Sequence, residues 1–232
     1  MLADGSLGET KRLHDVNRIL PADGPIGGTV FNKKLTHFNT QTGKCNLQKA
    51  PWNLFSSYWE WLKPREGELW MTSGRINERW QSGYDDRRRP YIVQRWPENW
   101  IELHPDDAAA NGIESGDYVM VYSNRIPVQK DTIVGIEGDD FDFASLLKNG
   151  HIELTKAAIT AVAIVTPAVK KGVGYMDFLH TSQPANALTG RVVDWISGNY
   201  NYKMGVGQVK RLGESPYKKQ FRSMSFARRD IA

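Results

Sequence analysis

The chain has 232 residues, of which 40% are hydrophobic and 24% charged, and its formal net charge is +4. This is the composition of an ordinary globular protein that is long enough to bury a sizeable core. The small positive charge comes without the long basic face or motif of a nucleic-acid-binding protein, so no nucleic-acid partner is expected. The single cysteine, Cys45, excludes an internal disulfide framework and an iron–sulfur cluster bound by several cysteines of this chain. The longest apolar stretch, residues 157–165, is too short to span a membrane.

Residues 1–65 are rich in Gly, Pro, Asn and Asp and mostly lack a regular hydrophobic period. They carry neither the apolar segment of a secretory signal nor a twin arginine. We expect an extended lead-in that is the remnant of preceding domains in a longer polypeptide, with a short strand or hairpin arm within residues 29–38. Aromatic side chains recur every three or four residues between Leu54 and Leu62, which predicts a short amphipathic helix ended by Pro64.

Residues 66–232 form a second, strand-rich domain in this interpretation. Pro105, followed by two acidic residues and ended by Gly112, marks a single short helix, and residues 141–148 are the other helical segment of this domain. Many short strands with few helices are typical of a closed β-barrel with small helical insertions, so the predicted fold class is mainly β, α+β. The predicted strands are short runs bounded by turn residues: Leu69–Thr72, Trp100–Leu103, Tyr118–Tyr122, Ile126–Gln129, Ala161–Val165 and Gly207–Leu212.

The first of these strands runs into the sequence Thr72-Ser73-Gly74-Arg75. Hydroxyl groups and free backbone amides at a strand end can bind an approaching ligand, and glycine permits close backbone contact. The Arg75 guanidinium can bind a phosphate through two hydrogen bonds. The alternative is an ordinary turn, because four residues are a weak signal.

A segment rich in arginine and aromatic residues follows, and it contains the turn Gln81-Ser82. Arginines that alternate with aromatic rings suit a flat heteroaromatic ligand that carries phosphates. The alternative is a solvated surface with ion pairs. The alternating residues are Arg75, Arg79, Arg87, Arg88, Arg89 and Arg95 with Trp80, Tyr84, Tyr91 and Trp96.

Further polar candidates lie at His104 and Asp107, where a strand meets a helix, and at Asn186 and Lys203. An acidic first turn is explained by helix capping alone, but a carboxylate there could also bind the amino and imino edge of a guanine. Asn186 offers donors and acceptors to a heterocycle, and Lys203 could meet a phosphate. No common catalytic or phosphate-loop motif and no nucleophile–base pair is present, so we expect no independent catalysis.

Taken in order, these motifs resemble the C-terminal cofactor-binding domain of molybdopterin oxidoreductases of the dimethyl sulfoxide reductase superfamily. The shared pattern is TSGR, a Trp-Gln-Ser-Gly turn, HPDDAAANGIESGDYVMVYS, an Ala-Asn-x-Leu-Thr segment and a late Tyr-Lys. Within that superfamily, SGRINERWQSGYDDRRRPYIVQRWPENWIELHPDDA is most similar to the large subunit of arsenite oxidase, and the resemblance covers essentially the whole chain.

The resemblance implies a six-stranded double-psi β-barrel and a bis(molybdopterin guanine dinucleotide) molybdenum cofactor. It implies no metal ligand among these residues, and an iron–sulfur cluster only in N-terminal regions outside this chain. By position in the family's motifs, the cofactor-binding residues would be Thr72, Ser73, Gly74, Arg75, Asn77, Gln81, Ser82, His104, Asp107, Asn186 and Lys203.

The resemblance also implies oxidation of arsenite to arsenate by the complete subunit, a Rieske iron–sulfur partner subunit and a periplasmic location. The remaining domains of the large subunit would be further partners, and this part by itself would be inactive. One alternative is the same domain of an arsenate reductase or another molybdopterin oxidoreductase. The other is a stand-alone β-barrel that binds nucleotides or anions.

Overall fold

The computed structural model describes residues 52–76, 88–131, 142–178, 180, 182–193 and 200–221. Within these ranges, no helix has the length and apolar character needed to cross a bilayer. The helices are α3 (Trp52–Leu62), α4 (Pro90–Arg95), α5 (Pro105–Ala110), α6 (Phe143–Lys148) and the 3-10 helix η4 (Ala185–Leu188). The strands are β1 (Leu69–Gly74), β2 (Trp100–Leu103), β3 (Asp117–Gln129), β4 (Ile152–Val165), β5 (Val173–Asp177) and β6 (Gly205–Glu214).

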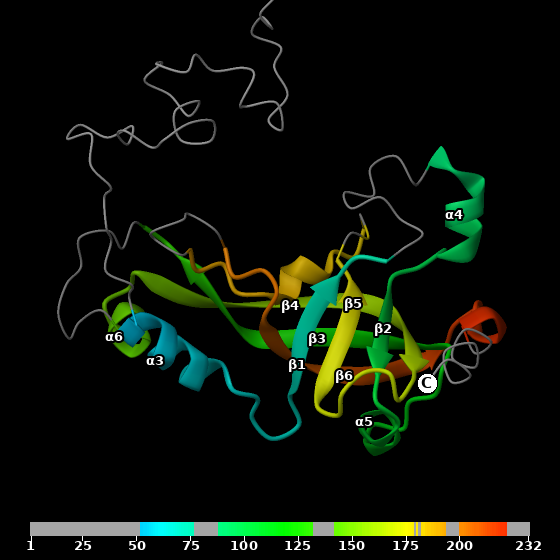
Figure 1. The fold of residues 1–232 in the computed structure, drawn as a ribbon, viewed down its shortest axis with the longest axis horizontal. Helices are drawn as coiled ribbons and strands as arrows, with labels where there is room; N and C mark the ends of the chain where they lie inside the picture. The colour runs from blue at the N-terminus through cyan, green and yellow to red at the C-terminus, as the bar shows by residue number, and fades with distance from the viewer. Residues whose placement is uncertain are drawn as a thin grey trace, which may run out of the picture. The chain divides into compact units, whose positions relative to one another are not determined.

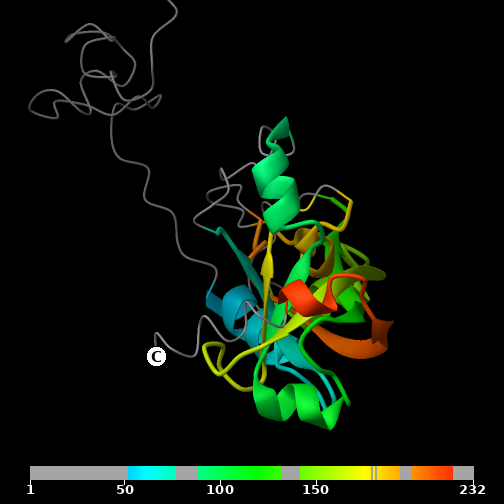
Figure 2. The ribbon, with the colours of Figure 1, turned by 90° about the vertical axis from the view of Figure 1, so that its right-hand side faces the viewer.

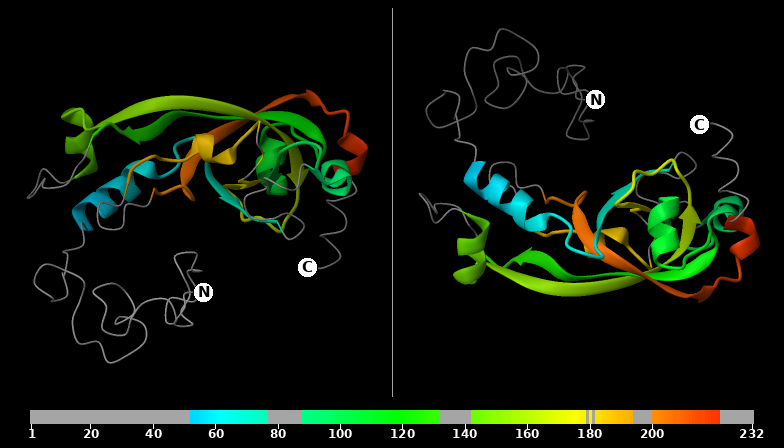
Figure 3. Two further views of the ribbon diagram at one scale, coloured as in Figure 1. Left: turned by 90° about the horizontal axis from the view of Figure 1, so that it is seen from above. Right: turned by 90° about the horizontal axis from the view of Figure 1, so that it is seen from below.

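The six strands close into a barrel in the order β1-β5-β2-β4-β3-β6 (Figure 1). The pairs β1·β5 and β2·β4 are parallel, and the other neighbours are antiparallel. Strands β3 and β4 are long and run side by side, as both views of Figure 3 show. Helices α4 and α5 lie at opposite ends of the barrel (Figure 2). The closed, mainly β barrel predicted from the sequence is confirmed.

The barrel interior is filled by alternate residues of the strands. In β3, the residues from Asp117 to Ser123 alternate between buried and partly buried positions, as expected when one face of a strand meets the core. Helix α5 closes one end of this core with the buried side chain of Ala108. The fully or nearly buried apolar residues of this cluster include Met71, Ile101, Leu103, Val119, Val121, Ala161, Ala163 and Met176.

A second apolar cluster joins α3 to α6 beside the barrel. The rings of Tyr58 and Phe143 stack with centroids 4.8 Å apart. The buried guanidinium of Arg125 donates to the carbonyls of Trp61, 2.8 Å, and Lys63, 2.8 Å, at the end of α3, and it pairs with Glu68 at 2.6 Å. Arg125 therefore binds the last turn of α3, whose carbonyls lack partners within the helix.

A third cluster lies under α4 and the C-terminal part of the described chain. Trp100 and Phe221 are fully buried there, and the rings of Trp96 and Phe221 meet edge to face at 6.3 Å. The Gln220 side chain donates to the carbonyls of Gln94 and Arg95, both at 2.9 Å, and so satisfies the end of α4. The residues around Phe221 thus hold a helix that is distant in sequence.

Several predicted elements are confirmed with changed bounds. The helix predicted from Leu54 begins at Trp52, and the strands predicted at 118–122 and 126–129 are one strand, β3, with a register shift between them. Strand β4 begins at Ile152, earlier than predicted. The hairpin arm proposed within residues 29–38 lies outside the described residues.

Strand β5 and helix α4 were not predicted, and both omissions have a local cause. The segment Gly172-Val173-Gly174 shows no strand signal, because glycine is depleted in strands. It is nevertheless held between β1 and β2 in the barrel. Helix α4 spans six residues and has Pro90 at its first position, so it shows less than two turns of any helical period.

Candidate functional site

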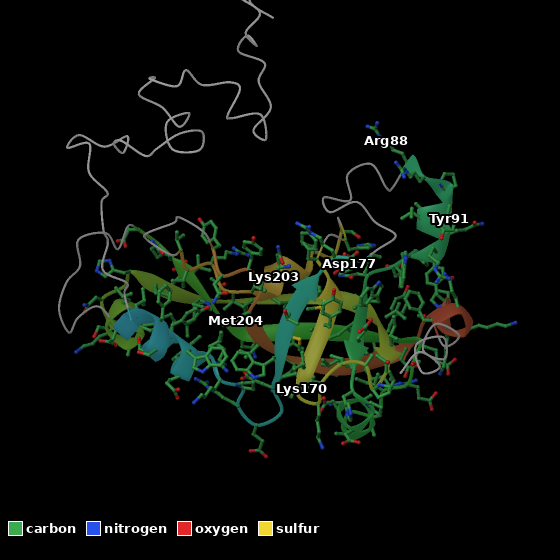
Figure 4. The ribbon with its side chains drawn as sticks, in the orientation of Figure 1. Arg88, Tyr91, Lys170, Asp177, Lys203 and Met204 are labelled. Atoms are coloured by element: carbon green, nitrogen blue, oxygen red, sulfur yellow. The ribbon has the colours of Figure 1, made fainter. Side chains whose placement is uncertain are left out.

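The ends of β1 and β5 lie side by side and form the base of the candidate site. Because the two strands are parallel, Ser73 pairs with Met176 and Gly74 with Asp177 at the same end of the barrel. Helix η4 contacts β1, and residues 200–204 lead into β6 next to it. Figure 4 shows Asp177 and Lys203 at this end, whereas Lys170 lies at the other. We call this end of the barrel the β5 exit; it comprises residues 72–75, 177–178, helix η4 and Lys203.

Three predicted site residues meet at the β5 exit through direct hydrogen bonds. The buried hydroxyl of Ser73 donates to Asn186 Oδ1 at 3.1 Å, and Lys203 Nζ donates to the Ser73 carbonyl at 2.9 Å. The Asn186 carbonyl in turn accepts from the Thr189 hydroxyl at 3.0 Å. The Asn186 carboxamide is therefore held in place, and within the described part of the chain its two N–H groups are left for an acceptor of a ligand.

Two close backbone approaches bring these side chains together. A Cβ on Gly205 would collide with the carbonyl of Leu188, so the start of β6 passes directly against η4. A Cβ on Gly74 would collide with the hydroxyl of Tyr175, and that hydroxyl donates to the Arg75 carbonyl at 3.0 Å. Glycine at these two positions thus permits the packing that places Asn186 and Arg75.

The remaining predicted residues of the TSGR motif lie at the same strand end. Thr72 is half-buried and pairs with Tyr175, and the Arg75 side chain is exposed. The Lys203 ammonium lies 4.9 Å from the ring centre of Phe178 and 5.8 Å from that of Tyr202, which keeps a positive charge over two aromatic rings. Asn77, Gln81 and Ser82 lie outside the described residues, so their assignment stays a prediction.

His104 and Asp107 lie at the opposite end of β5, and both side chains accept hydrogen bonds from backbone amides. His104 Nδ1 accepts from the amide of Asp106 at 3.2 Å and caps α5. Asp107 Oδ2 accepts from the amide of Gly172 at 2.7 Å, just before β5 begins. The structure therefore does not bring these two residues together with Ser73, and their predicted contact with a cofactor stays a prediction. We call this region the β5 entrance.

The side chains that gather at the β5 exit are mainly hydrogen-bond donors. Lysine and arginine carry positive charge, and the free part of Asn186 donates, so the site suits a ligand with phosphate or carbonyl oxygens. Sequence reasoning missed Tyr175, Asp177 and Phe178, because the strand that carries them was not predicted. In the ranges that the structure describes, no three His, Cys, Asp or Glu side chains gather closely enough to hold a metal ion.

Comparison with known families finds a match for one segment of the chain. Residues 69–134 match the model of the molydopterin dinucleotide binding domain, and this segment contains β1 with its TSGR end, α5 and all of β3. Over residues 69–134, which contribute three strands to the closed six-stranded barrel, the chain is thus similar to the molydopterin dinucleotide binding domain.

Individual relatives refine this assignment. The chain is 44% identical to iodate reductase subunit IdrA of Denitromonas iodatirespirans over 99% of its length, and 44% identical to the same subunit of Pseudomonas sp. (strain SCT) over 98%. In both cases it spans 26% of the relative, so it covers about a quarter of these proteins. Arsenite oxidase subunit AioA of Herminiimonas arsenicoxydans is 35% identical over 44% of the chain, which is 12% of that relative.

These relatives correct the family that the sequence motifs indicated. The similarity to arsenite oxidase is partial, whereas the similarity to iodate reductase extends over nearly the whole chain, so the alternative of another molybdopterin oxidoreductase is better supported. Among solved structures, acetylene hydratase from Pelobacter acetylenicus is 14% identical, with a TM-score of 0.43 over 83% of this chain and 25% of that chain. This likeness is too low to bear on function.

Proposed function

We propose that the chain is the C-terminal cofactor-binding part of the catalytic subunit of a molybdoenzyme that reduces iodate or a similar oxyanion. The observation that carries this proposal is the 44% identity to an iodate reductase subunit across 99% of the chain. The shared barrel accounts for binding of the cofactor but not for substrate choice. The identity over the whole chain is what favours an iodate reductase over other members of the superfamily.

The residues at the β5 exit fit the proposed cofactor, a bis(molybdopterin guanine dinucleotide) molybdenum group. Ser73, Gly74 and Arg75 offer a strand end with donors, and Asn186 and Lys203 face it from η4 and from the segment before β6. Such a donor set matches phosphate and carbonyl oxygens. When bound, the molybdenum centre supplies electron and oxygen-atom transfer, and the protein supplies binding and orientation.

The proposed roles of this chain are to bind and to orient. Lys203 is fixed by the Ser73 carbonyl and by the Phe178 ring, so its charge stays at the strand end and can offset a phosphate. The carboxamide of Asn186 is oriented by Ser73 before any ligand arrives. Because the donors are held by a closed barrel, little ordering is needed when the cofactor binds.

A second candidate is an arsenite oxidase, which the partial match of 35% over 102 residues favours. The two candidates share the cofactor and differ in substrate and in the direction of electron flow. Both sets of relatives are named as subunits, which supports a partner chain. A Rieske iron–sulfur partner, the remaining domains of the large subunit and a periplasmic location belong to this proposal as expectations from the family.

The test is to purify the protein from its natural host and to measure molybdenum, released guanine nucleotide and pterin fluorescence. Turnover is then followed with iodate and a reduced dye, and separately with arsenite and an oxidised dye. We expect bound cofactor and oxidation of the dye by iodate. Bound cofactor with turnover of arsenite alone would favour the second candidate, and a protein without pterin or molybdenum would refute both.

A further inference from the structure

Helix η4, which carries Asn186, packs against the strands β1, β3, β4 and β6. Its side chains Ala185 and Leu188 are buried in the core of the barrel. Residues three positions apart lie on the same side of a 3-10 helix, so these two residues hold one side of η4 to the core. How far η4 can rotate about this contact depends on what holds its two ends.

The C-terminal end of η4 is held by Thr189. The Thr189 hydroxyl donates to the Asn186 carbonyl at 3.0 Å, and Thr189 forms an antiparallel bridge with Gly205 at the start of β6. The N-terminal end lacks such a local contact. Pro184 stands at the N-cap, and within the described residues no side-chain hydrogen bond caps the helix there.

Gln183, directly before Pro184, attaches the N-terminal end of η4 to the barrel by two hydrogen bonds. Its side-chain Oε1 accepts from the amide of Thr160 in β4 at 2.9 Å. Its backbone carbonyl accepts from Asn99 Nδ2 at 2.7 Å. One bond involves the side chain of Gln183 and the other its main chain, so the residue is fixed in position and in orientation.

Asn99 is itself held firmly in the barrel wall. It is 1% exposed, its Oδ1 accepts from the Trp100 amide at 2.8 Å, and its carbonyl accepts from the Val162 amide at 2.8 Å. Both polar atoms of its carboxamide are used, so the side chain cannot turn without breaking a hydrogen bond. Because Ile101 in β2 pairs antiparallel with Met176 in β5, the start of β2 lies at the same end of the barrel as the β5 exit.

We infer that Asn99 and Gln183 are positioning residues, which fix the N-terminal end of η4 and thereby hold the Asn186 carboxamide in the orientation that binds a ligand. The inference rests on the proposed function, since the ligand is taken to be the proposed cofactor. The effect is indirect and acts through Asn186. A side chain that is oriented in advance loses less freedom when the ligand binds, so a loosened η4 should bind more weakly.

The experiment compares Gln183→Met with Gln183→Glu in the full-length holoprotein purified from its natural host. Methionine has a similar length but offers the Thr160 amide only a weak sulfur acceptor, whereas glutamate keeps an acceptor oxygen. We expect Gln183→Met to retain about three- to tenfold less molybdenum and pterin after dialysis, as for loss of one hydrogen bond. Gln183→Glu should retain cofactor like the wild type.

Asn99→Asp tests the second attachment, because it removes the donor to the Gln183 carbonyl and keeps an acceptor for the Trp100 amide. It should lower cofactor retention as Gln183→Met does. Asn99 is buried, and if Asn99→Asp does not fold, the two variants of the half-buried Gln183 still decide the matter.

Ser115→Ala is the matched control at the other end of β4. Ser115 Oγ accepts from the Val165 amide at 2.8 Å, so this variant also removes a side-chain acceptor from β4. Val165 pairs with Leu103, which lies just before α5 at the β5 entrance. Ser115→Ala should lower the melting temperature to a similar extent as Gln183→Met and leave cofactor retention unchanged.

Two further measurements separate positioning from stabilisation of the fold. In the Asn186→Ala background, Gln183→Met should cause no further loss of cofactor, because the carboxamide that it positions is absent. In cofactor-free protein, hydrogen exchange of the peptide that contains η4 should be faster in Gln183→Met than in the wild type or in Ser115→Ala.

The inference is overturned if Gln183→Met retains cofactor like the wild type, or if Ser115→Ala loses as much as Gln183→Met. It is equally overturned if Gln183→Met lowers retention by the same factor with and without the Asn186 carboxamide. A wild-type protein without cofactor would instead refute the proposed function, and the hydrogen-exchange comparison would still show whether Gln183 holds η4.

Discussion

The two ends of β5 use similar polar residues in different ways. At the β5 entrance, His104 and Asp107 bind backbone amides of neighbouring turns, so their hydrogen-bonding capacity serves α5 and the start of the strand. At the β5 exit, Ser73 and Asn186 bind each other across 113 positions of sequence. Polar side chains whose acceptors are bound to backbone amides build the fold, whereas polar side chains that bind one another can leave groups for a ligand.

We expect the largest effect from Gly74→Ala at the β5 exit. An added Cβ would collide with the Tyr175 hydroxyl, so the ring must move and its hydrogen bond to the Arg75 carbonyl is lost. We expect the free energy of unfolding to fall by about 1–3 kcal/mol, as for other overpacked sites, and cofactor content to fall as well. Both are measured by thermal melts and molybdenum analysis.

Tyr175→Phe is the control for Gly74→Ala, because it removes the hydrogen bond without adding a Cβ. It should lower the free energy of unfolding by less than Gly74→Ala does. Equal effects of the two variants would mean that the close approach at Gly74 is unimportant.

A comparison of Asn186→Ala with Asn111→Ala tests whether the β5 exit binds the cofactor and the β5 entrance does not. Asn186→Ala removes the oriented carboxamide at the β5 exit, and we expect about a tenfold loss of retained cofactor. Asn111 donates to the Asp107 carbonyl at 2.9 Å at the β5 entrance, on the surface. Asn111→Ala should leave cofactor content unchanged and lower the free energy of unfolding by less than about 1 kcal/mol. Loss of cofactor from Asn111→Ala but not from Asn186→Ala would reverse the assignment of the two ends.

The smallest expected effect is a dependence on pH at the β5 entrance. The hydrogen bond and the charge of Lys171 hold the pKa of Asp106 below its usual value, in an exposed pair with a separation of 3.0 Å. Because this pKa is lowered on folding, the pair stabilises the protein above the ordinary pKa of aspartate, and the contribution is lost as pH falls through the lowered pKa.

Melting temperatures of the wild type and Asp106→Asn should therefore differ slightly near neutral pH and converge in acid. High salt should reduce the difference as well, since both side chains are exposed. Cofactor content should not change in Asp106→Asn at any pH at which the protein stays folded. A difference that grows in acid would contradict this account of the Asp106–Lys171 pair.

Much of the barrel could be predicted from local patterns. Short runs bounded by turn residues indicated most of β3 and part of β4, and Pro105, two acidic residues and Gly112 indicated α5, whose capping the structure confirms. These signals lie within a few neighbouring residues, where propensity and period decide the structure. Strand β5 lacked such a signal, because its place between β1 and β2 comes from tertiary pairing.

The candidate site could be predicted only in part, for the same reason. The TSGR strand end has a chemical meaning that is readable in sequence, but the contact of Ser73 with Asn186 depends on how the barrel closes. Missing β5 also hid Asp177, since its position next to Gly74 follows from strand register alone. Conversely, the carboxylate of Asp107 could bind a ligand as far as the sequence tells, and only the structure shows that it binds the Gly172 amide.

The closure of the barrel also sets an order of events during synthesis. Strand β1 is the first strand of the barrel and β6 the last, and the two are neighbours. Lys203, which donates to the Ser73 carbonyl, lies two residues before the start of β6. On a growing chain, Ser73 therefore cannot form its hydrogen bonds with Asn186 and Lys203 until those residues, more than 100 positions later, have left the ribosome. Loading of the proposed cofactor would then be an event of the finished polypeptide, and a chain stopped before residue 203 would lack both Lys203 and strand β6.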